Sequence, residues 1–195
     1  SPFDTTAYIV AAARLGFSAA NAMRIAEDLY MNGFISYPRT DTTVYPASLD
    51  IEGILKTLRT SPFKKDVEWT IAHRRPVPTR GKKSTTDHPP IHPTSPATRE
   101  QLGDDVFKIY ELVLRRFLAT LAPDAVWKTL KILFVAGGEE YTTTGGQLIE
   151  PGWHAVYPFS EAKEVVLPAF SIGENLPLKK ITLDEKETQP PARYT

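Results

Sequence analysis

The sequence has no cysteine, no net charge and no long apolar run. Without cysteine, disulfides, thiolate zinc sites and cysteine nucleophiles are excluded. No stretch approaches the roughly 18 apolar residues of a membrane-spanning helix, and no signal peptide opens the sequence, so we expect a soluble cytoplasmic protein. Lys plus Arg number 23, as do Asp plus Glu. A neutral total argues against a protein that coats duplex DNA with its whole surface.

The remaining composition is that of an ordinary globular protein, with 42% hydrophobic and 24% charged residues. The one excess is proline, with 17 in 195 residues. The neutral total also averages two unlike parts, because residues 1–122 carry 16 basic and 13 acidic residues and residues 123–195 carry 7 and 10. We therefore expect a domain boundary near Pro123.

The first third of the chain has a helical pattern. Asp4 is one of the residues able to cap a helix that Gly16 ends, and Ser18 is a good N-cap for a second helix that Gly33 ends. A short strand is expected at residues 34–37. Two helices joined by a tight turn and followed by a strand form the outline of a winged helix-turn-helix.

Further helices are expected after Pro46 and, as the longest pattern, over residues 102–121, where Gly103 interrupts the first turn. Between them, residues 61–96 are rich in proline and basic side chains and predict a long irregular segment, too long for a simple connection. From residue 124 the pattern changes to β, with a strand at 125–135, a Gly137-Gly138 turn and short strands to the end. The predicted fold class is α+β: a helical domain at 1–122 and a β-rich, incomplete domain at 123–195.

The segment from Ile35 to Thr42 brings a phenol, a guanidinium, hydroxyls and a carboxylate together. A tyrosine with a pKa of about 10 is a weak nucleophile and needs a nearby cation. Arg39 is two residues from Tyr37, which on an extended chain puts both side chains on one face, and its fork suits a phosphate. The alternative is that Tyr37 is a half-buried strand residue followed by a turn.

Residues 34–42, FISYPRTDT, resemble the active-site signature Y-I-S/T-Y-x-R-T-D-S of type IA DNA topoisomerases. Residues 18–30 resemble the helix that precedes this signature in the family. Residues 87–94, DHPPIHPT, resemble its second motif, A-H-E-A-I-R-P-T or D-H-x-x-I-x-P-T, and residues 186–195, KETQPPARYT, resemble K-x-T-x-P-P-x-R-Y/F-T. Four motifs in the expected order span nearly the whole chain, so the resemblance is specific, and we expect the archaeal or reverse-gyrase-like branch of the family.

The resemblance implies a role for individual residues. Tyr37 matches the nucleophile, which attacks a single-strand phosphodiester and retains the 5′-phosphate as a phosphotyrosine. Arg39 matches the arginine that holds the scissile phosphate, and His88 matches a histidine near that phosphate, a hydrogen-bond donor or proton relay. Supporting positions are Thr40, Asp41 and Thr94.

Two positions depart from the family pattern: Thr42 stands where serine is commoner, and His92 stands where one motif variant has arginine. The basic loop beside His88 is either a solvated loop or a contact to the DNA backbone. Our candidate DNA contacts are Arg74, Arg75, Arg80, Lys82, Lys83, His92 and Arg193. Trp127 and Trp153 are either base-stacking or core residues, and their β patterns favour the core.

Type IA enzymes also have a Toprim domain, whose acidic cluster binds Mg²⁺. No D-x-D cluster in strand-loop context occurs in this sequence, so we expect no metal site. The resemblance implies a fragment that needs a Toprim domain of the same parent chain, with single-stranded DNA as its partner and no membrane. The parent would relax negatively supercoiled DNA by cutting one strand, passing another and resealing, near the nucleoid in a prokaryote.

Two other functions remain open. A winged-helix DNA-binding module without catalysis would use Tyr37 only as a core residue. A tyrosine recombinase would also form a phosphotyrosine, but it needs arginines and histidines before a C-terminal tyrosine, and here the tyrosine comes first.

Overall fold

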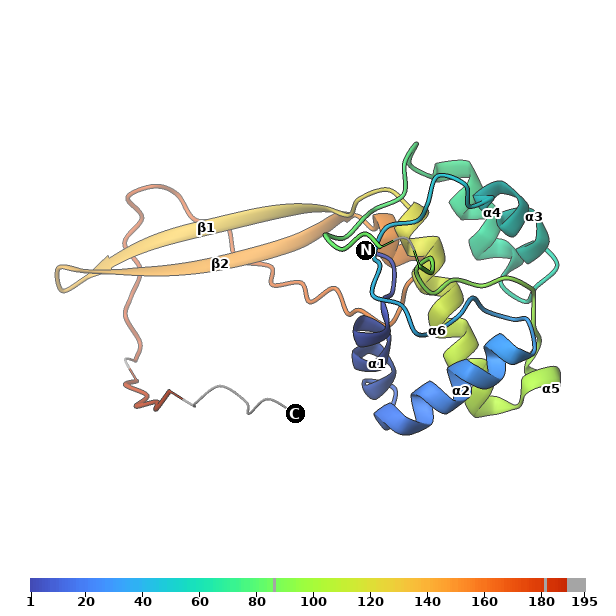
Figure 1. The fold of residues 1–195 in the computed structure, drawn as a ribbon. Helices are drawn as coiled ribbons and strands as arrows, with labels where there is room; N and C mark the ends of the chain where they lie inside the picture. The colour runs from blue at the N-terminus through green and yellow to red at the C-terminus, as the bar shows by residue number, and fades with distance from the viewer. Residues whose placement is uncertain (86, 181, 189–195) are drawn as a thin grey trace.

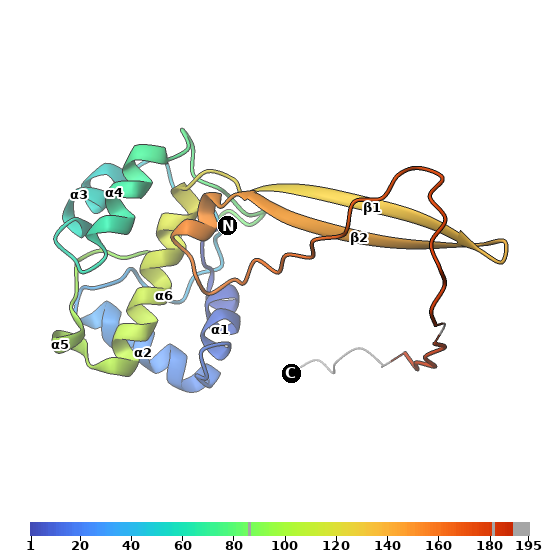
Figure 2. The same ribbon diagram turned by 180° about the vertical axis from the view of Figure 1, so that it is seen from behind.

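The computed structural model describes residues 1–85, 87–180 and 182–188 and shows a helical body from which a long β-hairpin projects (Figures 1 and 2). No helix in these residues is long and apolar enough to cross a membrane. The α+β class predicted from the sequence is confirmed. The elements are α1 (Thr5–Ala13), α2 (Ala19–Met31), α3 (Ile51–Leu58), α4 (Lys64–His73), α5 (Arg99–Leu102), α6 (Asp104–Leu121), β1 (Val126–Ala136), β2 (Glu139–Glu150) and the 3-10 helix η1 (Gly152–Ala155).

Helix α6 is the centre of the helical body, and α1, α2, α4 and η1 all contact it. Tyr110, Val113 and Phe117 on α6 are completely buried. Burying aromatic and aliphatic side chains of this size contributes about 1.5–3 kcal/mol each, so this helix holds the body together.

The ends of the first helices follow from their caps. The Asp4 carboxylate accepts a hydrogen bond from the Ala7 amide at 2.7 Å, and the Ser18 hydroxyl accepts one from Asn21 at 3.2 Å. Gly33 has φ +75°, a backbone conformation that residues other than glycine adopt only at an energetic cost, and it ends α2 as predicted. Of the predicted strand at 34–37, only a single bridge from Ile35 to Pro93 is present.

The prediction of an irregular segment over residues 61–96 is wrong for its first part, because Lys64–His73 form helix α4. Val67 and Thr70 of this helix are completely buried. The chain then runs without helix or strand through the described residues up to α5. Gly103, with φ +74°, separates α5 from α6 as expected.

The hairpin pairs β1 and β2 in antiparallel register, with Leu133 opposite Thr142. Gly137 and Gly138 both have positive φ, as a two-residue hairpin turn of type I′ requires. The expected series of short strands is wrong: β2 continues to Glu150, and the described chain beyond it adds only a bridge from Val165 to Gly146.

The chain after the hairpin returns to the helical body. Val156 and Tyr157 are buried there, and the Arg115 guanidinium donates a hydrogen bond to the Val156 carbonyl at 3.2 Å. The hairpin thus leaves the body close to Pro123, where we predicted a domain boundary, but the body includes residues on both sides of the hairpin.

Candidate active site

The Tyr37 ring is half-buried and lies between two other rings. One ring comes from a residue before the predicted signature in the sequence and the other from a residue after it. The Tyr30 ring, on α2, packs edge-on against it with centroids 5.2 Å apart. The His88 ring lies 4.7 Å away at a tilt of 56°. The structure therefore brings together the tyrosine of the first motif and the histidine of the second.

Arg39 extends toward helix α2, where it pairs with Glu27. The Arg39 Nε donates to Glu27 Oε1 at 2.9 Å, and Nη2 contacts the same oxygen. The Arg39 side chain is 61% exposed and that of Glu27 41%. The hydrogen bond and the charge of Glu27 raise the pKa of Arg39, so the guanidinium is positively charged beside Tyr37 at any working pH.

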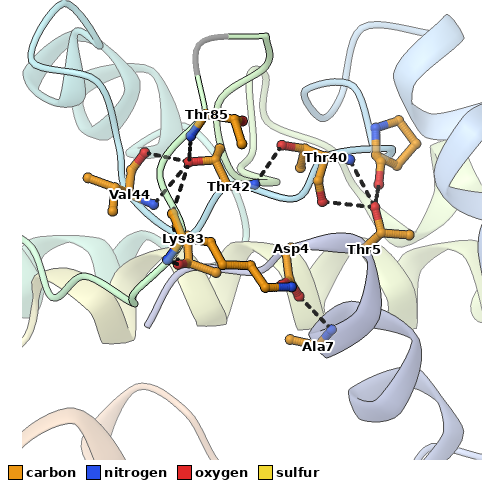
Figure 3. Close-up of polar contacts among 10 residues, drawn as sticks. Asp4, Thr5, Ala7, Thr40, Thr42, Val44, Lys83 and Thr85 are labelled. Carbon is orange, nitrogen blue, oxygen red and sulfur yellow. Dashed lines mark hydrogen bonds and ion pairs between the residues drawn. The ribbon is translucent and has the colours of Figure 1, made fainter.

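Threonine hydroxyls hold the signature segment to helix α1 (Figure 3) and also to the second motif. The Thr5 hydroxyl donates to the Pro38 carbonyl at 2.8 Å and accepts from the Thr40 amide at 2.9 Å. The Thr40 hydroxyl donates to the His88 carbonyl at 3.0 Å. Thr40 thereby links the strand-like segment of Tyr37 directly to the backbone of His88.

A second set of threonines holds the basic loop that leads to His88 (Figure 3). The Thr43 amide donates to the Lys83 carbonyl at 2.8 Å, and the Lys83 amide donates to the Thr43 hydroxyl at 3.1 Å. The Thr42 hydroxyl accepts a long hydrogen bond from the Thr85 amide at 3.4 Å. Thr42 stands where serine is commoner in the family motif, and its hydroxyl still takes part in hydrogen bonds.

A pocket of about 380 Å³ opens beside these groups. Arg39, Thr40, Asp41 and His88 line it, together with Thr5, Thr6, Thr85 and Asp87. The pocket offers hydroxyl groups and the Arg39 guanidinium to a phosphate, and among the described residues that line it Asp41 and Asp87 are acidic. No group of three or more His, Asp or Glu side chains among the described residues is placed to hold a metal ion.

Three of the basic residues predicted to contact DNA form ion pairs with acidic residues in the structure. Arg74 pairs with Glu52, and Arg75 pairs with Asp124 at 2.8 Å, so both contact acids of the helical body. Lys83 lies 3.6 Å from Asp4. In the described part of the chain Arg80 and Lys82 are exposed, with no ion pair, and Arg193 lies outside the described residues.

His92 was predicted to contact DNA, which requires a position at the surface, but the structure places it in the core. Its side chain is 4% exposed, and its Nδ1 lies 2.7 Å from the Pro90 carbonyl. The Tyr45 and Phe117 rings pack against it. Burial lowers the pKa of His92, which favours the neutral ring. A direct contact of His92 with DNA therefore requires this segment to move.

Two other predicted positions have structural contacts. Thr94 is exposed and its hydroxyl donates to the Gly33 carbonyl at 2.8 Å, joining the second motif to the end of α2. Trp153 packs against the core, as predicted, and stacks on His154 with ring centroids 3.8 Å apart. The prediction of a core position is wrong for Trp127, which lies on the hairpin and is 37% exposed because the two-stranded hairpin projects from the helical body (Figure 1).

Three residues at the site were not among the predicted ones: Thr5, Glu27 and Tyr30. Glu27 and Tyr30 lie within residues 18–30, which resemble the family's helix before the signature. The resemblance therefore covered both residues without indicating which side chains they contact. For Thr5 no sequence pattern gives a signal, because its partners Pro38 and Thr40 are far along the chain.

The chain is similar to DNA topoisomerases over its whole length. The family model described as DNA topoisomerase matches residues 1–195. The chain is 45% identical over its whole length to DNA topoisomerase 1 of Archaeoglobus fulgidus, covering 29% of that protein. It is 37% identical over 188 residues to human DNA topoisomerase 3-beta-1, covering 95% of this chain and 22% of that protein.

The fold is also that of a topoisomerase. Full-length topoisomerase I from Thermotoga maritima superposes with a TM-score of 0.62 at 24% identity, covering 87% of this chain and 28% of that one. The chain belongs to the DNA topoisomerase family, in its type IA branch. It spans less than a third of the length of the curated relatives it matches.

Proposed function

We propose that Tyr37 is the nucleophile of a type IA DNA topoisomerase. Its phenolate oxygen attacks the phosphorus of a single-strand phosphodiester, the bond from phosphorus to the 3′-oxygen breaks, and the departing 3′-oxygen takes up a proton. The 5′-phosphate remains on Tyr37 as an ester. Attack by the 3′-hydroxyl reverses these steps and reseals the strand without an external energy source.

The observation that carries this proposal is the contact of the Tyr37 and His88 rings, 4.7 Å apart, beside a pocket lined by Arg39. Arg39 supplies positive charge for the phosphate oxygens as charge develops on them. An imidazole beside the phenol is a suitable proton donor or acceptor near neutral pH. Thr40 supports this arrangement through the His88 backbone.

The described residues contain no group of three or more His, Asp or Glu side chains placed to hold a metal ion, and the family resemblance implies a Toprim domain with an acidic cluster. We therefore propose that any Mg²⁺ is held by a Toprim domain of a longer polypeptide that includes this chain. That enzyme would relax negatively supercoiled DNA, in the cytoplasm near the nucleoid of a prokaryote. On its own the chain should bind single-stranded DNA weakly and should not turn over. Efficient Mg²⁺-dependent cleavage by the chain alone would contradict the proposal that a Toprim domain is needed.

The test of the nucleophile is Tyr37→Phe in the full-length enzyme, incubated with an end-labelled single-stranded oligonucleotide. We expect the covalent protein–DNA complex to fall to background, because phenylalanine has no oxygen to attack phosphorus. Tyr30→Phe is the matched control, since it removes the neighbouring phenol hydroxyl and keeps the ring that packs on Tyr37. Its covalent complex should persist.

The chemistry of the trapped end separates the alternatives. A 5′-phosphotyrosine supports the proposal, whereas a 3′-phosphotyrosine would indicate a recombinase-type reaction. Unchanged activity in Tyr37→Phe would indicate that this tyrosine has only a structural role in a DNA-binding module.

A further inference from the structure

Helix α2 contacts both of the side chains to which we assign the chemistry. Glu27 binds the Arg39 guanidinium, and Tyr30 packs on the Tyr37 ring. Residues three apart on a helix lie on the same face, so one surface of α2 holds the nucleophile and the arginine. The opposite face of α2 is fixed in the core by Ala22, Ile25, Ala26 and Leu29.

The geometry of the pair leaves much of the Arg39 guanidinium available. Nε and Nη2 of Arg39 both contact Oε1 of Glu27, and within the described residues Nη1 makes no hydrogen bond. A guanidinium has five N–H donors, so the edge that faces away from Glu27 can still donate to a phosphate. Arg39 also lines the pocket beside His88.

We propose that Glu27 is a positioning residue for strand cleavage, an inference that rests on the proposed function. Its carboxylate holds the 61% exposed Arg39 side chain in one place beside Tyr37, with the outer edge of the guanidinium directed to the incoming phosphate. An arginine that is held in advance loses less conformational freedom when the phosphate arrives.

The same carboxylate should weaken DNA binding. Glu27 brings a negative charge close to the position of a phosphate, and like charges repel. Glu27 is therefore expected to oppose substrate binding while it favours the reaction of the bound strand. A residue with a merely structural role would not change these two quantities in opposite directions.

The experiment compares Glu27→Ala, Glu27→Gln and wild type in the full-length enzyme. It measures the single-turnover rate of covalent complex formation with an excess of enzyme, and separately the Kd for the same oligonucleotide. For Glu27→Ala we expect cleavage on the order of tenfold slower, as for a modest misplacement of a reacting group. The Kd should be equal to or lower than that of wild type.

Glu27→Gln keeps an oxygen that accepts from Arg39 but removes the charge. It should cleave faster than Glu27→Ala and bind DNA more tightly than wild type at low salt. Asp28→Ala is the matched control, because Asp28 is the next residue on α2 and its carboxylate pairs with Arg24, not with Arg39. That variant should cleave at the wild-type rate.

The outcomes separate the inference from the proposed function. Equal cleavage rates in Glu27→Ala and wild type would overturn the positioning role while leaving Tyr37 as the nucleophile. A slower rate accompanied by equally weakened DNA binding would overturn it as well. If wild type forms no covalent complex through Tyr37, the proposed function itself fails.

Discussion

Single polar side chains hold the segment around Tyr37 in addition to its apolar packing, in which Ile35 is buried. Thr40 is 6% exposed and Thr42 is 1% exposed. Their buried hydroxyls hold this segment by hydrogen bonds. Each such hydrogen bond contributes about 1 kcal/mol, but losing one partner leaves a buried polar group unsatisfied. The position of His88 therefore depends on Thr40 of the first motif, through its hydrogen bond to the His88 carbonyl.

His92 gives a prediction about stability and pH. Burial lowers its pKa, so the folded protein resists a proton that the unfolded chain binds below about pH 6.5. Above that pH the His92 ring is neutral in both the folded and the unfolded state, so its protonation does not lower the free energy of unfolding. As the pH falls below it, stability should decrease, by at most about 1.4 kcal/mol per pH unit for one proton.

The measurement is urea unfolding at pH 7.5 and pH 5.5. His92→Asn keeps a donor for the Pro90 carbonyl and does not titrate, so its stability should change less between the two pH values than that of wild type. His73→Asn is the control, because His73 is exposed and also contacts a backbone carbonyl, that of Trp69. An equal pH dependence in wild type and His92→Asn would contradict the prediction.

The motifs identified the residues that we propose as reacting groups, but they did not indicate what surrounds these residues. Tyr37 and His88 were predicted from short patterns, and the structure brings their rings together. His92 occupies a motif position, yet a motif does not report whether a side chain is buried. The contact of Glu27 with Arg39 depends on how α2 lies against the signature segment, and no local pattern in the sequence gives that geometry.

Among the elements, those with strong local signals were predictable. Helix α2 has a capping serine and an apolar face of period 3.6, and the hairpin has β-branched residues around a Gly-Gly turn. Helix α4 has neither signal. Its N-cap is Phe63, which makes no side-chain cap, and only Val67 and Thr70 are buried along it. Packing against α3 and α6, and not local preference, forms this helix.

The cap of α2 can be tested directly. In Ser18→Ala the Asn21 amide loses its side-chain acceptor, and we expect a loss of about 1 kcal/mol in the free energy of unfolding. Ser18→Asp is the matched control, because aspartate is an equally good N-cap and its charge favours a helix N-terminus. It should be as stable as wild type in urea or thermal unfolding. If both variants lose the same stability, the hydrogen bond of the cap is not the cause.

For the molecule as a whole, the helical body includes chain from before and after the hairpin, and Arg115 on α6 joins these parts. Its guanidinium lies 3.2 Å from Asp66 on α4 and 2.6 Å from Glu111 on α6, and it donates to the carbonyl of Val156 beyond the hairpin. It also lies 5.1 Å from the centre of the Phe63 ring. The Arg115 side chain is only 16% exposed, so water screens these interactions less than at the surface.

We therefore expect Arg115→Met to lower the free energy of unfolding by about 2 kcal/mol, since two partly buried carboxylates lose their cation and Val156 loses a donor. Arg24→Met is the matched control: it breaks an exposed i,i+4 pair with Asp28 and should cost about 0.5 kcal/mol or less. Urea unfolding with the same m-value for both variants would show that the body loses stability as one cooperative unit. Equal losses in the two variants would mean that the contacts of Arg115 do not join the two sides of the hairpin more strongly than a surface ion pair does.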